Sequence, residues 1–398
     1  MSNKILIQEK LDQATAILNE FDVDVWLTFV RETTLSPDPT LELVAGVDVT
    51  WQSAFILCRD GHHIAIAGRF DTENIEQLGA YSEIIAYDKG IAKHLVAVMD
   101  RLNPQMIAIN YSENDVAADG LSHGMCRNLV RYFAGTAHEG KLVSAEKLVG
   151  ALRGRKSPAE VELVRQAVMT TEKLFDEVEA FAKPGMTQKQ IADFVRGRID
   201  EMGLGYAWPK PFNPIVTCGP HSAVGHAAAG DVVLEKGHTL HLDLGIKENE
   251  YCSDIQRMWY VLADGETAVP TDVQDAFDVV YGAIKAGESM LTPGTPGWQV
   301  DEAARDFIVD NGYDEYMHAF GHLLGRVAHD GATVLGPKWE RYAGICELPV
   351  EVGNIFTLEL HVVVPNRGIM SLEEDVLVTD DGVEYLSIPQ TELRLIRP

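Results

Sequence analysis

The chain has 398 residues, of which 46% are hydrophobic and 23% are charged, and its formal net charge is −27. The composition is that of an ordinary globular protein, but the length exceeds a typical domain of about 100–150 residues and favours two domains. The negative charge argues against nucleic acid and anionic membrane surfaces as partners, because both select basic patches.

Redox and targeting features favour a cytoplasmic protein. The five cysteines are scattered, odd in number and without a CxxC pair, which is typical of reduced thiols. The N-terminal segment has the pattern of an amphipathic helix with acidic residues throughout, unlike a signal peptide. No apolar run approaches the ~18 residues of a membrane span, so no membrane association is expected.

Apolar runs alternate with helical patterns over the first 150 residues, which predicts a small α/β domain. Strands are expected at 23–30, 53–58, 63–68, 83–87 and 106–110, and helices near 71–79, 91–102 and 121–134. No glycine-rich phosphate loop follows a strand, so a nucleotide site is not expected. Residues 31–51 are too long for a tight connection and predict either a binding loop or a short helix around Pro39–Ala45.

A domain boundary is predicted within residues 152–160. Ser157 suits an N-cap, Pro158 suits the first helical turn, and Glu160 completes a capping box. Apolar residues then recur at helical spacing, and this helix should end before Pro184. We therefore divide the chain into domains of residues 1–152 and 153–398.

The second domain contains a weak internal repeat. Residues 184–199 resemble residues 293–308, since both have a Pro-Gly pair followed by the pattern of a capped helix. Each copy precedes strand-rich sequence, which suggests an α+β domain with pseudo-twofold symmetry and a site between its halves. Chance similarity would explain the repeat equally well.

Five residues with metal-ligand side chains lie in short apolar segments of the C-terminal half. They are Asp243, Asp254, His322, Glu359 and Glu373. A buried, ionised carboxylate is costly unless it is paired or metal-bound, and these segments contain almost no matching cations. Each residue alone would be read as a strand-edge or structural residue, but together they predict a site for two divalent metals. Oxygen ligands with one imidazole suit Mn²⁺, with Co²⁺ or Zn²⁺ as alternatives.

The spacing of the two aspartates predicts a shared strand pair. Gly245 and the polar residues 246–250 have the pattern of a hairpin turn, so two antiparallel strands would present Asp243 and Asp254 from neighbouring positions. Two metals about 3.5–4 Å apart can share a hydroxide and polarise a carbonyl.

Histidines are the candidate donors to substrate. In a metal pocket, His226 and His329 would donate to a substrate carbonyl or a tetrahedral intermediate, and otherwise they would be core or surface residues. We expect His221 and His361 to be structural or peripheral.

Together these residues resemble the pita-bread metallopeptidases, which include methionine aminopeptidase, aminopeptidase P, prolidase and creatinase. The resemblance covers essentially the whole chain and implies an α/β N-terminal domain of the creatinase/prolidase type followed by a pita-bread catalytic domain. It implies that Asp243, Asp254 and Glu373 hold one metal and that Asp254, His322, Glu359 and Glu373 hold the other. It also implies that Glu359 is the general base on the bridging water and that His226 and His329 bind substrate. The five intact ligand positions disfavour creatinase.

Two motifs depart from those of the proline-specific members of the family. Those members usually carry Glu-Pro-Gly-x-Tyr at the first glutamate, whereas Leu360, His361 and Val363 stand here. They also usually carry an arginine two residues before the second glutamate, where this chain has Ser371. The arginine normally braces a metal ligand and helps to order the pocket, so its loss removes the usual route of substrate recognition but not the metal chemistry. Candidate arginines for a substrate carboxylate are Arg326, ranked ahead of Arg31 and Arg367.

We therefore expect a cytoplasmic, homodimeric Xaa-Pro dipeptidase, or prolidase, with two metal ions, most favourably Mn²⁺, and a small peptide as substrate. An Xaa-Pro aminopeptidase that acts on longer peptides is the nearest alternative. A non-catalytic pita-bread binding protein is an alternative of a different class.

Overall fold

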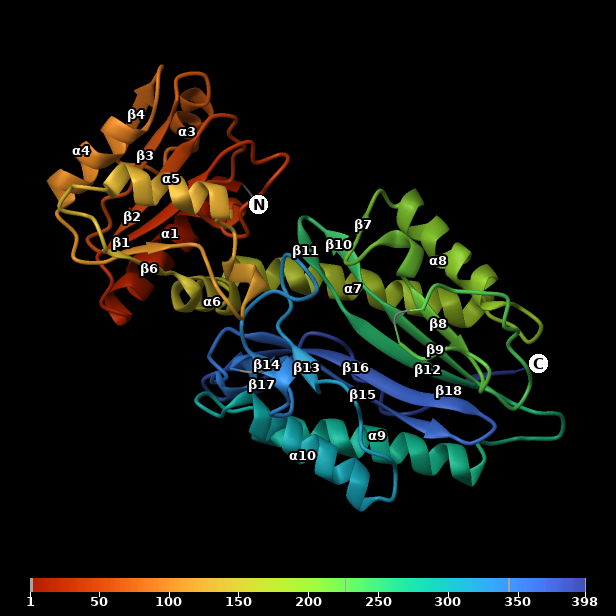
Figure 1. Ribbon diagram of the computed structural model, residues 1–398. Coiled ribbons are helices and arrows are strands. Elements are labelled where there is room, and N and C mark those ends of the chain that lie inside the picture. The colour runs from red at the N-terminus through yellow and green to blue at the C-terminus, as the bar shows by residue number, and fades with distance from the viewer. Residues whose placement is uncertain (1–2, 226, 343, 398) are drawn as a thin grey trace. The chain divides into compact units, whose positions relative to one another are not determined.

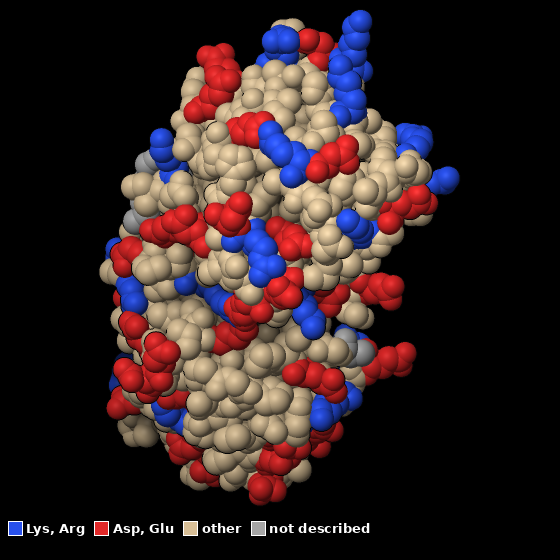
Figure 2. Space-filling model, turned by 90° about the vertical axis from the view of Figure 1, so that its left-hand side faces the viewer, with Lys and Arg blue, Asp and Glu red and all other residues tan. Residues whose placement is uncertain are grey.

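The computed structural model describes residues 3–225, 227–342 and 344–397. The chain divides into two compact units, Met1–Arg153 and Gly154–Pro398 (Figure 1). None of the described helices is both long and apolar enough to cross a membrane. On the face drawn in Figure 2, lysines and arginines are interspersed with acidic side chains and form no broad basic patch.

The N-terminal unit is built around a six-stranded sheet with the order β4-β3-β2-β1-β5-β6. Its strands are β1 (Val25–Val30), β2 (Ser53–Cys58), β3 (Ile64–Gly68), β4 (Glu83–Tyr87), β5 (Ile107–Ile109) and β6 (Leu142–Ser144). Strand β2 pairs antiparallel with β1 and β3, and the other pairs are parallel. Strands β1, β2, β3 and β5 are buried along their whole length, which requires cover on both faces.

Helices supply that cover. They are α1 (Asn3–Glu20), α2 (Leu41–Val44), α3 (Thr72–Leu78), α4 (Ala92–Leu102), α5 (His123–Phe133) and α6 (Glu146–Gly154). Helices α1, α3 and α6 pack with Trp26 and Phe55 in one core cluster. Helices α4 and α5 pack with Leu27 and Ile56 in another. Because Trp26 and Leu27 are adjacent on β1, the two clusters lie on opposite faces of the sheet.

The local sequence patterns predicted most of this unit. The five expected strands and three expected helices are present within a few residues of their predicted bounds. Helix α2 shows that the short-helix interpretation of residues 39–45 is correct, and its Leu41, Leu43 and Val44 are buried. Strand β6 and helix α6 were not predicted.

The C-terminal unit contains a seven-stranded sheet in which β15-β16-β12-β9-β8 form a path, with β17 on β16 and β18 on β12. These strands are β8 (Ile215–Cys218), β9 (Thr239–Leu244), β12 (Ile255–Val261), β15 (Ile355–Val364), β16 (Gly368–Thr379), β17 (Gly382–Tyr385) and β18 (Arg394–Ile396). Smaller strands are β7 (Gly205–Tyr206), β10 (Ile246–Glu248), β11 (Tyr251–Cys252), β13 (Gly321–His322) and β14 (Val334–Leu335). Short 3-10 helices lie at Val116–Ala118 in the N-terminal unit and at Lys210–Phe212, Glu340–Tyr342 and Ile345–Glu347 here.

Two helix pairs accompany this sheet. They are α7 (Pro158–Phe181) with α8 (Gln188–Glu201), and α9 (Thr271–Met290) with α10 (Gly297–Asp310). In Figure 1 the first pair lies beside β8 and β12, and the second beside β15 and β16. The apolar residues Phe356, Leu358 and Leu360 of β15 pack in the same core as α9 and α10. Since they alternate with Glu359, these helices cover the face opposite to that glutamate.

The predicted helix caps are partly confirmed. Ser157 and Glu160 form the expected capping box at the start of α7. In the repeat, Thr187 and Gln190 form a capping box for α8. The expectation of a capped second copy is wrong, because α10 follows Pro296, which has no side chain that could accept the hydrogen bond.

A buried arginine joins the first helix pair to the sheet. Arg257 of β12 is 0% exposed, and its Nη2 lies 2.5 Å from Glu172 Oε1 of α7 and 3.0 Å from Glu374 Oε2 of β16. The guanidinium also donates to the main-chain oxygens of Gln256, Glu373 and Ile388. These bonds provide the pairing that a buried charge requires.

Replacing this arginine should destabilise the protein strongly. Arg257→Met leaves the carboxylates of Glu172 and Glu374 buried without this cation, so we expect the free energy of unfolding to fall by about 3–5 kcal/mol. Urea-induced unfolding at a constant metal concentration measures this loss of stability. The control is Arg165→Met, which breaks a partly exposed pair with Glu384 and should cost about 1 kcal/mol or less. Equal losses in the two variants would contradict the role given to Arg257.

Candidate metal centre

A row of polar side chains crosses one face of the C-terminal sheet. The strand register pairs, in succession, Glu359 of β15, Glu373 of β16, Gln256 of β12, Asp243 of β9 and Ile215 of β8. Directly paired residues point to the same face of a sheet. The register therefore places three carboxylates and one amide side by side.

Asp254 joins this row from the two-residue link between β11 and β12. The predicted hairpin between the aspartates is present in a more elaborate form. Strands β9 and β12 are antiparallel neighbours, but β10 and β11 form an extra hairpin between them. Its turn residues, Asn249 and Glu250, have positive φ angles of 50° and 68°. The turn thus lies at the end of the predicted segment, and Gly245 precedes β10.

His322 is brought to the row by close contact between β13 and β15. A Cβ atom on Gly321 would lie 1.9 Å from the main-chain oxygen of Thr357, so only glycine permits this approach. The His322 main-chain N–H donates to Thr357 Oγ1 at 3.2 Å. The ring Nε2 then lies 3.8 Å from Asp254 Oδ2 and 3.7 Å from Glu359 Oε1.

The structure brings the five predicted ligands together in one cavity of ≈ 300 Å³. Possible ligand atoms of Asp254, His322 and Glu373 all lie within 4.8 Å of one another. Asp243 and Glu359 line the same cavity. Asp254 and Glu373 are buried, whereas the other three are partly exposed toward the cavity.

Burial and mutual repulsion govern the charges in this cavity. Burial, reinforced by the neighbouring carboxylates, raises the pKa values of Asp243, Asp254 and Glu373 well above their ordinary range. Burial also raises the pKa of Glu359 to about 7, although a hydrogen bond from Gln256 opposes the shift. These carboxyl groups therefore need protons or cations around them at neutral pH.

The donor set fits divalent metal ions. Burial lowers the pKa of His322 to about 3, so its imidazole is neutral and has a free electron pair for a metal. Asp243 Oδ1 and Glu373 Oε2 are buried without a hydrogen-bond partner in the described part of the chain. No lysine or arginine is among the described residues that line the cavity. Clustered carboxylates with one neutral imidazole are ligands typical of Mn²⁺, Co²⁺ and Zn²⁺.

His329 lies beside the cluster on a loop that is held by the buried Asp330. Its ring centroid is 4.3 Å from that of His322, and the rings are nearly perpendicular. The neighbouring Asp330 is buried, lies 3.4 Å from the buried Lys156 Nζ, and accepts a hydrogen bond from the Arg326 main chain at 2.8 Å. His226 lies outside the described residues, so its expected place in the site stays a prediction.

The site has a second lobe of ≈ 100 Å³ beside Asp243 and Glu359. Its lining is mainly neutral and polar, with Thr217, His241, Gln256, Tyr316, His318, His361 and Ser371. Burial lowers the pKa values of His241 and His361 to about 4, so both rings are neutral. The structure places His361 in this lobe, and sequence reasoning missed His241, His318 and Gln256. Strand alternation offered a signal, because His241 and His361 lie two residues from Asp243 and Glu359 and share their faces.

The first lobe also has apolar lining residues. Trp208, Pro209, Phe212 and Ile215 line it together with the carboxylates. Neither lobe contains the arginines expected to bind a substrate carboxylate. The Arg326 guanidinium lies 5.3 Å from the Tyr251 ring centroid, and Arg367 bonds to Gly237, Tyr260 and Asp272. The assignment of Arg326, Arg31 or Arg367 to the substrate carboxylate therefore stays a prediction, and none of them is among the described residues that line either lobe.

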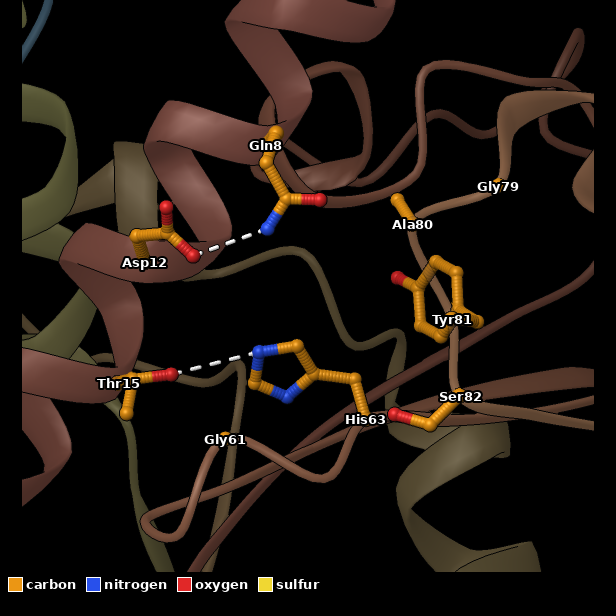
Figure 3. A pocket seen from close by; sticks show the side chains of 9 residues that line it. All are labelled: Gln8, Asp12, Thr15, Gly61, His63, Gly79, Ala80, Tyr81 and Ser82. Carbon is orange, nitrogen blue, oxygen red and sulfur yellow. Dashed lines mark hydrogen bonds between the residues drawn. The ribbon is translucent and has the colours of Figure 1, made fainter.

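The N-terminal unit has a separate polar hollow of ≈ 480 Å³ (Figure 3). Its polar side chains are bonded to one another: Gln8 donates to Asp12 at 2.9 Å, and Thr15 Oγ1 lies 3.3 Å from His63 Nε2. Asp12 is the one carboxylate in its described lining. This hollow therefore lacks the ligand cluster of the C-terminal unit.

Comparison with known proteins gives one family and one fold. The model of metallopeptidase family M24 matches residues 162–380. An uncharacterised peptidase of Staphylococcus haemolyticus is 26% identical over 336 residues, which cover 84% of this chain and 87% of that protein. Among solved structures, an Xaa-Pro dipeptidase from Bacillus anthracis has a TM-score of 0.74 at 22% identity, covering 98% of this chain and 100% of that one. An X-Pro aminopeptidase from Thermotoga maritima has a TM-score of 0.73 at 23% identity, with 96% and 100% covered. The predicted fold class is confirmed.

Removing metal should make stability fall as the pH rises. Without metal, the native carboxyl groups with raised pKa values keep protons that the unfolded chain releases above about pH 4. The unfolded state then binds fewer protons than the native state, so the free energy of unfolding decreases up to about pH 7, the pKa of Glu359. Bound metal replaces these protons and should remove the decrease.

Urea-induced unfolding at about pH 5 and pH 7.5, with chelator or with Mn²⁺, measures this difference. Other titrating groups affect both samples alike, so the metal-free protein should lose stability relative to the metal-loaded protein. An identical pH dependence with and without metal would show that the cluster does not carry the charge imbalance described above.

Proposed function

We propose that this chain, which belongs to metallopeptidase family M24, is a dinuclear Xaa-Pro dipeptidase, or prolidase. The observation that carries this proposal is the convergence of Asp243, Asp254, His322, Glu359 and Glu373 on one cavity. The similarity in fold to the Bacillus anthracis Xaa-Pro dipeptidase supports it.

The five residues divide between two metal positions. Asp243, Asp254 and Glu373 would hold one ion, and Asp254, His322, Glu359 and Glu373 would hold the other. When bound, the two ions would supply a nucleophile at neutral pH and polarise the scissile carbonyl. Asp254 and Glu373, which are 6% and 1% exposed, would contribute to both positions.

The remaining chemistry is assigned to side chains that face the cavity. Glu359 takes the proton of the attacking water and returns it to the leaving amine, because its carboxylate lines the cavity beside His322. His329, next to His322, donates to the substrate carbonyl as negative charge develops on it. His226 has the same proposed role. The apolar lobe around Trp208 accommodates a hydrophobic part of the peptide.

Further features of the proposal concern the working enzyme. We propose Mn²⁺ as the metal, because oxygen donors dominate the ligand set. We also propose a cytoplasmic homodimer that takes small peptides and binds neither nucleic acid nor membranes. The net charge of −27 supports the absence of nucleic acid and anionic membrane surfaces as partners.

One observation favours a second candidate, an Xaa-Pro aminopeptidase that acts on longer peptides. No lysine or arginine is among the described residues that line either lobe. A dipeptide places its free carboxylate close to the metals, where a paired arginine would bind it best. A lobe lined largely by hydroxyl, amide and imidazole side chains does not supply a cation for that carboxylate, and this favours substrates whose C-terminus extends beyond the site.

A peptide panel decides between these functions. Protein loaded with Mn²⁺ should cleave Xaa-Pro and should cleave Xaa-Ala much more slowly. Xaa-Pro-Yaa and amidated Xaa-Pro test the second candidate, because faster cleavage of these peptides would identify an aminopeptidase. If the folded, metal-loaded protein cleaves none of these peptides, both assignments are wrong.

A matched pair of variants tests the role of the base. Glu359→Gln should lower kcat/KM by ~10²-fold or more. Glu384→Gln removes a half-exposed carboxylate on β17 and should leave the rate unchanged. A Glu359→Gln variant with the wild-type rate would remove Glu359 from the mechanism.

A further inference from the structure

Gln256 is the one residue in the carboxylate row that supplies a hydrogen-bond donor. It lies on β12 between Asp243 and Glu373 in the strand register and is 5% exposed. Its side chain reaches along the row to Glu359, where Nε2 donates to Oε2 at 2.9 Å. The other carboxylate oxygen, Oε1, faces His322. One oxygen of Glu359 is therefore restrained by an amide, while the other faces the ligand cluster.

The oxygen end of the same amide is held from two sides. Gln256 Oε1 accepts a hydrogen bond from Ser371 Oγ at 2.5 Å and lies 2.8 Å from His241 Nε2. Ser371 and His241 are 2% and 5% exposed, so water does not compete freely for these bonds. Ser371 Oγ also lies 3.1 Å from the main-chain oxygen of Leu360, the residue after Glu359, and the shorter contact to Gln256 is the better one for its single hydrogen.

This arrangement favours one orientation of the amide. Exchanging the oxygen and nitrogen of Gln256 would place two acceptors, Oε1 of Gln256 and Oε2 of Glu359, against each other. It would also direct the amide N–H groups at Ser371 and His241 and withdraw the donor from the carboxylate. The ionised Glu359 carboxylate, which can only accept, thus selects this orientation, and the Ser371 hydroxyl and a His241 ring protonated on Nε2 satisfy the oxygen end of the amide.

We propose that Gln256 is a positioning residue for Glu359 and that Ser371 and His241 hold its amide with the donor facing that carboxylate. The inference rests on the proposed function only in taking Glu359 as a metal ligand. It assigns a role to Ser371, which stands where the proline-specific relatives usually carry an arginine. In this protein, hydrogen bonds from Ser371 to Gln256 and from Gln256 to Glu359 would brace Glu359 without a positive charge.

Metal affinity tests the proposal without any peptide. Gln256→Met keeps the length of the side chain but removes both its hydrogen-bonding ends. Calorimetric titration of the metal-free protein with Mn²⁺ should show an affinity about 10–100-fold lower than wild type, the usual effect of losing a group that orients a metal ligand. Ser371→Ala should cause a smaller loss, because His241 still holds the amide.

The double variant distinguishes positioning from general damage to the sheet. If Ser371 acts only through Gln256, then Ser371→Ala should cause no further loss of affinity in the Gln256→Met background. Gln390→Met is the matched control. Gln390 is another buried glutamine, and its amide bonds to the main-chain nitrogen and oxygen of Met258 on β12. This control should lower the unfolding temperature and leave Mn²⁺ affinity unchanged.

The proposal would be overturned if Gln256→Met bound Mn²⁺ with wild-type affinity. It would also be overturned if the fold-loss of affinity in the double variant equalled the product of the fold-losses in the two single variants. Ser371→Ala removes a single oxygen atom and is expected to fold, so an unchanged affinity in that variant would also count against the proposal even if Gln256→Met failed to fold. A wild-type protein that binds no Mn²⁺, Co²⁺ or Zn²⁺ would instead overturn the proposed function from which the inference starts.

Discussion

Mutual repulsion among four carboxylates in one cavity is the constraint around which the C-terminal unit is organised. The register of β15, β16, β12 and β9 places three of them in a row, and Asp254 lies immediately before β12. No described lysine or arginine lines this cavity to offset them. Such an arrangement is stable when protons or cations bind, and the neutral imidazole of His322 completes a donor set suited to divalent metals.

The two faces of β12 carry side chains of different charge: an arginine on one face and a neutral amide on the other. Arg257 points toward the helices, where its guanidinium bonds to Glu172 and Glu374 and thereby neutralises carboxylates on that side. Gln256, one residue earlier, points into the cavity and gives Glu359 a hydrogen bond without a positive charge. A cation at position 256 would offset the charge that attracts metal. The amide orients the ligand and leaves the negative charge of the cluster available.

Local patterns predicted the parts of the fold that depend on local physics. Alternation and helical periodicity gave the strands and helices of the N-terminal unit, and capping chemistry gave the start of α7 at Ser157. Strand β13 is two residues long, which is too short for any periodicity, and its place beside β15 depends on tertiary contact at Gly321. The bond between Gln256 and Glu359 depends on strand order, because β16 lies between their strands. Alternation alone could have placed His241 and His361 in the site.

The central claim is that these five residues hold two metal ions. Anomalous diffraction from crystals grown with Mn²⁺ tests it most directly. The account predicts two peaks about 3.5–4 Å apart, with Asp254 and Glu373 touching both, Asp243 touching one, and His322 and Glu359 touching the other. A map with no peak in this cavity, or with a single ion that leaves Asp243 or His322 without contact to metal, would contradict it.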